Sequence, residues 1–231
     1  MTSPSPLLFN NYYHIYVRGT NRENIFVQER NYTHFMNLYW KYIEPITDTF
    51  AYCLLRNHAH IMVRTKSQEE ILENKKILVK TLKVSLPNPG YDKQDSPANR
   101  GENLQRKPLG SDYISRQFSN FLNAYAKAIN NAYSRTGSLF EHPFGRVLIT
   151  SERQFWNVIA YIHKNPQKHK FVKDFRDWKY SSYGIILSEK RTSISRNEVM
   201  KWFGSKDDYL RMHEQWVEGA NSHWLSEDDF D

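Results

Sequence analysis

The chain has 231 residues, of which 39% are hydrophobic, so it can form one domain with a substantial core. Its 32 lysines and arginines outnumber 25 acidic residues, and this net charge of +7 favours a polyanionic partner, either nucleic acid or an acidic membrane. Aromatic residues make up 15% of the chain and can stack on bases, so we favour nucleic acid. The single cysteine, Cys53, excludes an internal disulfide and a cysteine-rich zinc site, and because no segment is typical of a signal peptide or a membrane span we expect a cytoplasmic protein.

Four elements are predicted in the first part of the chain. Residues 12–19, YYHIYVRG, alternate and are rich in strand-forming side chains, so they predict a strand. Residues 31–46 carry aromatic and aliphatic side chains at helical spacing, and Pro45 marks the end of this helix. Residues 49–57 are apolar on both faces like a central strand, and residues 58–65, HAHIMVRT, predict a second strand paired with it.

An insertion is predicted after these strands. Ser67 and Glu70 form a capping box for a basic helix that extends to about Ser85. Residues 87–112 then contain four prolines and almost no apolar side chain, which is typical of a long loop. We therefore assign residues 67–112 to an insertion within one domain and not to a boundary between two domains.

Two helices and a strand-like segment are predicted in the next part of the chain. Apolar side chains recur at helical spacing from Tyr113 onward, and residues 138–149 predict a broken strand. Ser151 begins another helix as its cap. We expect this helix to end near Asn165, because Pro166 disfavours helical conformation in the residue before it.

The order of these elements predicts the fold class. Strand, helix, strand, strand, helix, strand and helix follow one another, as in an α+β fold with a ferredoxin-like antiparallel sheet and helices packed on one face. We assign residues 1–190 to this domain, with residues 67–112 inserted, and residues 191–231 to a C-terminal extension that ends in the acidic segment SEDDFD.

Two histidines in the strand of residues 58–65 are the first candidates for chemistry. Strand side chains alternate, so His58 and His60 share one face and are close enough for both rings to bind one divalent ion. Two ligands leave a metal site incomplete, so a third protein ligand must come from elsewhere. A structural or exposed role is the commoner one for a histidine pair, and at this point it stays open.

The helix of residues 152–165 can supply the missing ligand. Its apolar stripe should dock on the sheet and place Tyr161 and Asn165, four residues apart, side by side at the edge, with His163 off this flank and exposed. An amide oxygen suits Mg²⁺ or Mn²⁺. A tyrosine hydroxyl can attack a phosphodiester and become covalently linked to it. Because the chain has 15 tyrosines, a packing role for Tyr161 is the open alternative.

Three blocks of sequence carry a family resemblance. NHAHIMV at residues 57–63 looks like the His-hydrophobic-His motif of the HUH endonucleases. YIHKNPQKHKFV at 161–172, followed by WKYSSY at 178–183, is similar to the tyrosine-helix block of single-tyrosine transposases, especially the REP-associated tyrosine transposases (RAYTs). RTGSLFEHPFGRVLI at 135–149 resembles the segment that precedes this block. The resemblance spans residues 9 to 185.

The resemblance implies a ferredoxin-like HUH domain that binds and cleaves hairpin-forming single-stranded DNA with a divalent metal. By position, His58, His60 and Asn165 match metal ligands, and Tyr161 matches the nucleophile that becomes joined to a 5′ phosphate while a 3′-OH is released. Asn165 stands where relatives carry a polar metal ligand and is a weaker ligand than a carboxylate or a histidine, and Arg56 stands where relatives often have proline. The resemblance is poor in the insertion and the C-terminal extension.

Basic side chains are candidates for phosphate contacts with the expected partner, single-stranded or hairpin DNA. Those nearest the proposed chemistry are Lys164, Lys168 and Lys170, and the others are Lys75, Lys76, Lys80, Lys83, Arg116, Lys127, Arg135 and Arg146. Relatives occur as monomers or homodimers, and we favour a monomer. Two rival functions stay open: a catalytically inactive nucleic-acid-binding protein on the same fold, and a metal hydrolase that attacks phosphodiesters with water.

Overall fold

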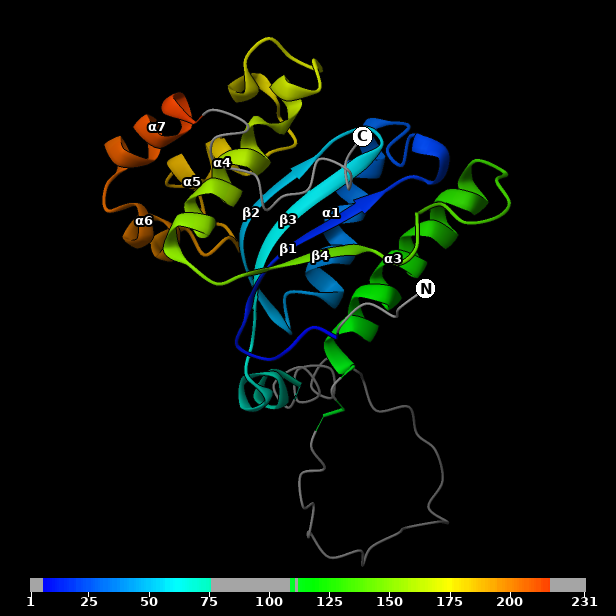
Figure 1. Ribbon diagram of the computed structural model, residues 1–231. Coiled ribbons are helices and arrows are strands. Elements are labelled where there is room, and N and C mark those ends of the chain that lie inside the picture. The colour runs from blue at the N-terminus through cyan, green and yellow to red at the C-terminus, as the bar shows by residue number, and fades with distance from the viewer. Residues whose placement is uncertain (1–5, 76–108, 111, 217–231) are drawn as a thin grey trace, which may run out of the picture.

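A four-stranded antiparallel sheet forms the centre of the computed structural model (Figure 1). The model describes residues 6–75, 109–110 and 112–216, so most of the predicted insertion and the acidic C-terminal segment lie outside the described residues. The strands occur in the sheet order β2-β3-β1-β4, and neighbouring strands are antiparallel. Their bounds are Tyr12–Arg18 for β1, Thr47–Leu54 for β2, His58–Thr65 for β3 and Gly145–Ile149 for β4.

The helices complete a ferredoxin-like unit and add a C-terminal group to it. The chain order β1-α1-β2-β3-α3-β4, with β1 and β3 central, is the ferredoxin-like arrangement, so the predicted α+β class with an antiparallel sheet is confirmed. Residues 68–75 are also helical, and Ser67 and Glu70 form the predicted capping box. The other helices are α1 (Glu29–Tyr42), α3 (Tyr113–Ala132), α4 (Glu152–Lys168), α5 (Tyr183–Leu187), α6 (Arg196–Phe203) and α7 (Lys206–Gln215), and the 3₁₀ turns are η1 (Thr20–Arg22) and η2 (Phe175–Asp177).

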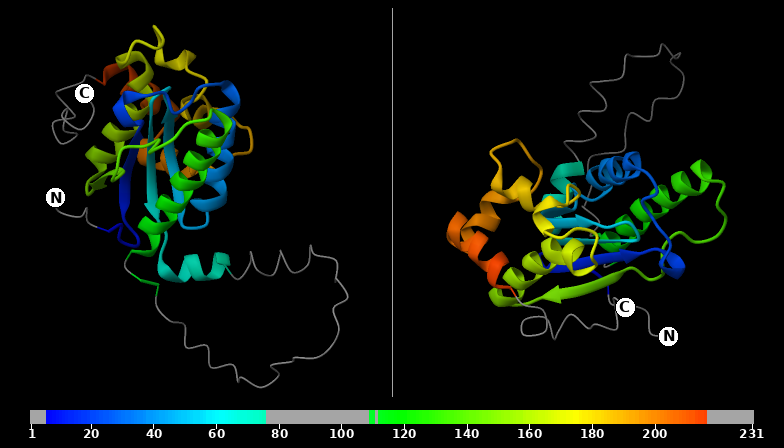
Figure 2. Two further views of the ribbon diagram at one scale, coloured as in Figure 1. Left: turned by 90° about the vertical axis from the view of Figure 1, so that its right-hand side faces the viewer. Right: turned by 90° about the horizontal axis from the view of Figure 1, so that it is seen from above.

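The two faces of the sheet are covered by different helices (Figure 2). α1 and α3 of the ferredoxin-like unit share one face as expected, where the Tyr39 hydroxyl lies 2.7 Å from that of Thr49. α4 covers the opposite face, where Phe155 packs on Phe50 with ring centroids 5.4 Å apart. Every residue of β3 except Arg64 is therefore buried: the strand has a neighbouring strand on each side and helices over both of its faces.

The end of α4 differs from the sequence prediction. The helix continues past Asn165 to Lys168 and includes Pro166, which we expected to lie beyond its end. A proline in the last turn removes only one backbone donor, and the chain closes the turn by other bonds: His169 N–H donates to the Asn165 carbonyl at 3.0 Å and Phe171 N–H to the Pro166 carbonyl at 2.9 Å. Burial of Asn165 and Pro166 against the fold stabilises this last turn.

The described part of the C-terminal extension packs on α4. The Trp156 indole N–H donates to the Trp202 carbonyl at 3.0 Å, and the Trp202 ring stacks on Phe155 with centroids 4.4 Å apart. α6 and α7 therefore support the helix that carries Tyr161, while the boundary near residue 190 stays a prediction. Among the described helices, none is long and apolar enough to cross a membrane.

Candidate active site

The four side chains proposed for chemistry come together between β3 and α4. The His60 and Tyr161 rings are 5.4 Å apart at their centroids, and His58 Nε2 lies 3.1 Å from Asn165 Oδ1. All four side chains are buried, with at most 4% of any residue exposed. The geometry required for a joint site is thus present, and the chemical roles of the four residues stay predictions.

The sequence of α4 explains why its polar side chains point at the sheet. Phe155, Val158, Ile159 and Ile162 are all fully buried or nearly so, and this apolar stripe fixes the rotation of the helix. Tyr161 and Asn165 follow one another at i and i+4 along the same side, so docking of the stripe carries both onto the histidine face. Their burial therefore follows from hydrophobic contacts made by neighbouring residues.

The histidines at this site are neutral. Burial lowers the pKa of His58 to about 4 and holds the pKa of His60 well below its usual value. A neutral imidazole has one N–H and one nitrogen lone pair, and that lone pair is what binds a metal. The site therefore keeps its two histidines in the protonation state that a metal ligand needs.

Asn57 selects which nitrogen of His58 carries the proton. Its Oδ1 lies 2.8 Å from His58 Nδ1, and since an amide oxygen only accepts, Nδ1–H is the donor. His58 Nε2 then presents its lone pair to Asn165 Oδ1, another acceptor, at 3.1 Å. The Asn165 amide can satisfy this lone pair by turning its N–H toward it; with its oxygen facing the ring, a cation bound by both atoms would make the contact favourable.

The donor set fits Mg²⁺ or Mn²⁺. His58 Nε2 and Asn165 Oδ1 lie 3.1 Å apart, so both atoms could contact one small divalent ion. The His60 ring is 5.1 Å from the His58 ring and steeply inclined to it, at 83°. No group of three or more His, Cys, Asp or Glu side chains suited to a metal occurs among the described residues, so a closed all-protein cage is not formed there. Two imidazoles and one amide oxygen would leave coordination positions for water and phosphate oxygens.

Tyr161 has a cation beside its ring. Lys168 Nζ lies 5.6 Å from the ring centroid, and the Trp216 ring packs 6.1 Å away. The ammonium faces the electron-rich face of the ring, which is a cation–π contact. Tyr161 is only 2% exposed, and its hydroxyl oxygen is buried.

Two further histidines lie at the site that the sequence analysis did not select. His14 of β1 places Nε2 3.0 Å from His60 Nδ1, and the His169 ring lies 4.9 Å from the His58 ring. His14 alternates with Tyr12 and Tyr16 in its strand, but only the register between β1 and β3 shows that it shares a face with His60. His169 follows the end of α4, beyond the point at which we expected the helix to stop.

The prediction that His163 is exposed is wrong. This residue is fully buried, with Nε2 2.8 Å from the Ser182 hydroxyl and Nδ1 2.8 Å from His213 Nε2. α7 supplies His213, and it covers the side of α4 that the helical pattern alone assigns to solvent. The polar cluster of His163, Ser182 and His213 thus joins the tyrosine helix to the C-terminal helices.

The basic residues proposed as DNA contacts are dispersed over the molecule. Near the site, Lys164 Nζ donates to the Trp216 carbonyl at 3.0 Å, whereas Lys170 is exposed. Lys76, Lys80 and Lys83 lie outside the described residues. The others are engaged as follows: Lys75 over the Tyr113 ring at 4.1 Å, Arg116 with Asp112 at 3.0 Å, Arg146 with the Ser115 hydroxyl at 3.2 Å and Arg135 in an ion pair with Glu23, while Lys127 is exposed.

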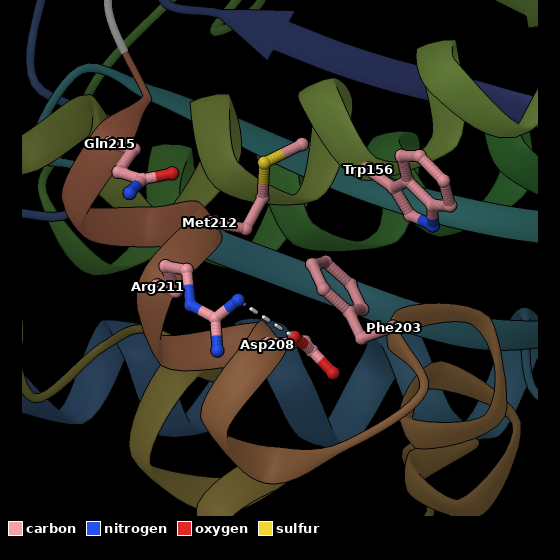
Figure 3. Close-up of a pocket in the computed structure, with 6 residues that line it drawn as sticks. All are labelled: Trp156, Phe203, Asp208, Arg211, Met212 and Gln215. Carbon is pink, nitrogen blue, oxygen red and sulfur yellow. Dashed lines mark ion pairs between the residues drawn. The ribbon is translucent and has the colours of Figure 1, made fainter.

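A separate pocket of about 230 Å³ lies between α4 and the C-terminal helices (Figure 3). Asp208 and Arg211 form an ion pair of 3.4 Å at its rim. Trp156, Phe203, Met212 and Gln215 complete its lining. None of these residues belongs to the histidine–tyrosine site, so the pocket and the proposed chemistry are distinct.

Two comparisons find proteins similar to this chain, one by sequence and one by fold. No family model matches the chain. A Haemophilus influenzae protein described as a "putative REP-associated tyrosine transposase" is 30% identical over 84 residues, which are 36% of this chain and 48% of that protein, so the match spans about half the relative's length. A solved structure of a REP-associated tyrosine transposase bound to a REP hairpin has the same fold, with a TM-score of 0.52 and 14% identity over 82% of this chain and 87% of that one. The chain therefore resembles the REP-associated tyrosine transposases, in sequence over about a third of its length and in fold over most of it, as its motifs predict.

Proposed function

We propose that this protein is a single-tyrosine enzyme that nicks and transfers strands of hairpin-forming or single-stranded DNA with the help of Mg²⁺ or Mn²⁺. One observation carries the proposal: the Tyr161 ring lies 5.4 Å from His60, on a helix whose Asn165 lies 3.1 Å from His58. The hairpin as substrate is supported by the solved structure of similar fold, which is bound to a REP hairpin.

The proposed reaction exchanges one phosphate ester for another. Tyr161 Oη attacks the phosphorus, an Oη–P bond forms, the P–O3′ bond breaks, and the leaving 3′ oxygen takes up a proton as the phenol loses one. The DNA is then joined to Tyr161 through its 5′ phosphate. Because one P–O bond forms for each that breaks, a second 3′-OH can reverse the step and complete strand transfer.

The chain's own residues supply binding, orientation and charge. His58, His60 and Asn165 would hold the ion, which when bound polarises a phosphoryl oxygen and stabilises the leaving alkoxide. The Lys168 ammonium, 5.6 Å from the Tyr161 ring, stabilises the phenolate that develops during attack. Burial of the site strengthens this interaction, since few water molecules screen it. All these residues belong to one chain, so a monomer is sufficient, and we propose that it acts in the cytoplasm.

The proposal is tested by trapping the covalent intermediate. The protein is incubated with labelled hairpin oligonucleotides and Mn²⁺, and a protein–DNA adduct is sought on a denaturing gel. We expect an adduct with the wild type, none with Tyr161→Phe, and an unchanged adduct with Tyr183→Phe, which removes the hydroxyl of another buried tyrosine, on α5. Binding without any wild-type adduct would support the inactive binder, and cleavage that persists in Tyr161→Phe would support hydrolysis by water.

A further inference from the structure

We propose that His14 is a positioning residue, which holds the His60 imidazole in the tautomer that can bind a metal. This inference rests on the proposed metal-dependent function. It concerns a residue of β1, a strand that carries none of the residues assigned above to metal binding or nucleophilic attack.

The register of the sheet brings the two rings into contact. β1 and β3 are antiparallel neighbours, with Tyr16 opposite His60 and His14 opposite Met62, so His14 and His60 lie on a diagonal of one face. Their rings are stacked, with centroids 5.1 Å apart and planes 26° from parallel. His14 is fully buried and His60 is 1% exposed, and His14 Nε2 lies 3.0 Å from His60 Nδ1. This distance is that of a hydrogen bond between the rings.

The direction of that hydrogen bond decides whether His60 can bind a metal. A contact between two neutral imidazole nitrogens needs one N–H donor and one lone-pair acceptor. If His60 Nδ1–H donates to His14 Nε2, the lone pair of His60 lies on Nε2, where it can bind the ion. If His14 donates instead, the proton of His60 lies on Nε2 and that nitrogen cannot be a ligand. A metal role for His60 therefore requires His14 to be the acceptor.

The two nitrogens of the His58 ring also have different roles, one in a hydrogen bond and the other toward the proposed metal. Its Nδ1–H donates to Asn57 Oδ1 at 2.8 Å, and its Nε2 faces Asn165 Oδ1 at 3.1 Å. Both histidines would then use Nδ1 for support and Nε2 for the metal. Loss of such a supporting hydrogen bond typically lowers metal affinity by about 10- to 100-fold.

His14 also contacts the nucleophile. The Tyr161 ring packs edge-on against His14, with centroids 5.8 Å apart, and in the same manner against His60. A single ring of β1 therefore orients a metal ligand and forms part of the wall against which the tyrosine rests. A side chain of different shape at position 14 would disturb both the His60 ring and the Tyr161 ring.

Three variants separate this role from simple packing. His14→Phe keeps a ring of similar size and removes the acceptor, whereas His14→Gln keeps an acceptor near the position of Nε2. His213→Phe is the matched control, because His213 is also a fully buried histidine with a histidine partner at 2.8 Å, but lies on α7. Folding of each variant is checked by circular dichroism, and Mn²⁺ affinity is measured by titration calorimetry.

We expect His14→Phe to weaken Mn²⁺ binding by about 10- to 100-fold, His14→Gln to restore most of it, and His213→Phe to leave it unchanged. In parallel, long-range ¹H–¹⁵N spectra of the metal-free wild type should show the Nδ1–H tautomer for His60. This readout does not depend on the folding of any variant.

Three results would overturn the inference. Wild-type affinity in His14→Phe, or an Nε2–H tautomer of His60 in the wild type, would remove His14 from its role and leave the proposed function standing. A wild type that binds no Mn²⁺ would remove both the inference and the metal-dependent function on which it rests.

Discussion

Replacement of Asn165 by aspartate isolates the metal-binding claim. The substitution keeps the size of the side chain and converts the proposed neutral oxygen ligand, fully buried and 3.1 Å from His58 Nε2, into a carboxylate. Mg²⁺ and Mn²⁺ bind carboxylate oxygens more strongly than amide oxygens. Without metal, however, the same carboxylate is fully buried, which disfavours its charged form.

The expected magnitudes follow from burial. A carboxyl group in such an environment commonly has its pKa raised by about 3 units, and each unit corresponds to about 1.4 kcal/mol, so the metal-free variant should lose about 4 kcal/mol of unfolding free energy near pH 7.5. Binding of an ion at about 100 times its dissociation constant adds about 2.7 kcal/mol. Because the carboxylate binds the ion more tightly than the amide does, this gain should be larger for Asn165→Asp than for the wild type.

Urea unfolding with and without Mn²⁺ measures both effects. Asn157→Asp is the control, since Asn157 is buried at 3% exposure on the same helix but lies about 12 Å away along the axis. We expect both variants to be destabilised without metal and only Asn165→Asp to gain more from Mn²⁺ than the wild type. Equal gains in the two variants, or no extra gain in Asn165→Asp, would refute the assignment of Asn165 as a ligand.

Three further predictions concern charge near α4. Lys168→Met should slow adduct formation by about tenfold with DNA binding retained, whereas Lys173→Met should not; equal rates in both variants would contradict phenolate stabilisation. Lys164→Met should lower the free energy of unfolding by about 1 kcal/mol, because the Lys164 ammonium donates to the Trp216 carbonyl. Unchanged stability together with a weaker salt dependence of DNA binding would instead show that Lys164 contacts a phosphate. Burial lowers the pKa of His213 to about 4, so below pH 6.5 the unfolded chain takes up this proton first. This residue should contribute a loss of about 1.4 kcal/mol in the free energy of unfolding by pH 5.5, in addition to the losses from the other buried histidines, and His213→Phe should make the urea-unfolding profile less steep by that amount. An unchanged profile would contradict the burial of a neutral His213.

Local patterns predict the elements that position the site. The strand of residues 58–65 has the bounds expected from its sequence, because alternation and its flanking turn residues both act within a few positions. The start of β2 at Thr47 lies two residues before the expected one, since Thr47 pairs with Thr65 across the sheet. Pairing with a distant strand extends an element in a way that its own sequence does not show.

The end of α4 shows where a local rule is insufficient. The preference of a residue before proline concerns only the backbone of Asn165, whereas the helix is held past Pro166 by burial and by the bond from His169 N–H to the Asn165 carbonyl. The same extension brings the His169 ring into contact with the His58 ring. Because we predicted that the helix ends near Asn165, we did not select His169 as a candidate residue.

Contacts between distant elements account for the other residues that were missed. His14 is joined to His60 by strand register, and His163 is covered by α7, whose sequence begins more than forty residues later. The pattern of side chains within β1 or α4 cannot predict these two contacts, because the partner lies in another element. The resemblance to known transposases directed attention to the histidine pair and the tyrosine, while the residues that support them needed the folded chain.

The most direct test of the account is to find the atom to which DNA becomes attached. The adduct formed with a hairpin oligonucleotide and Mn²⁺ is digested with protease, and the nucleotide-bearing peptide is sequenced by mass spectrometry. A nucleotide joined through its 5′ phosphate to Tyr161 is the predicted result. Attachment to another tyrosine, or through a 3′ phosphate, would contradict it.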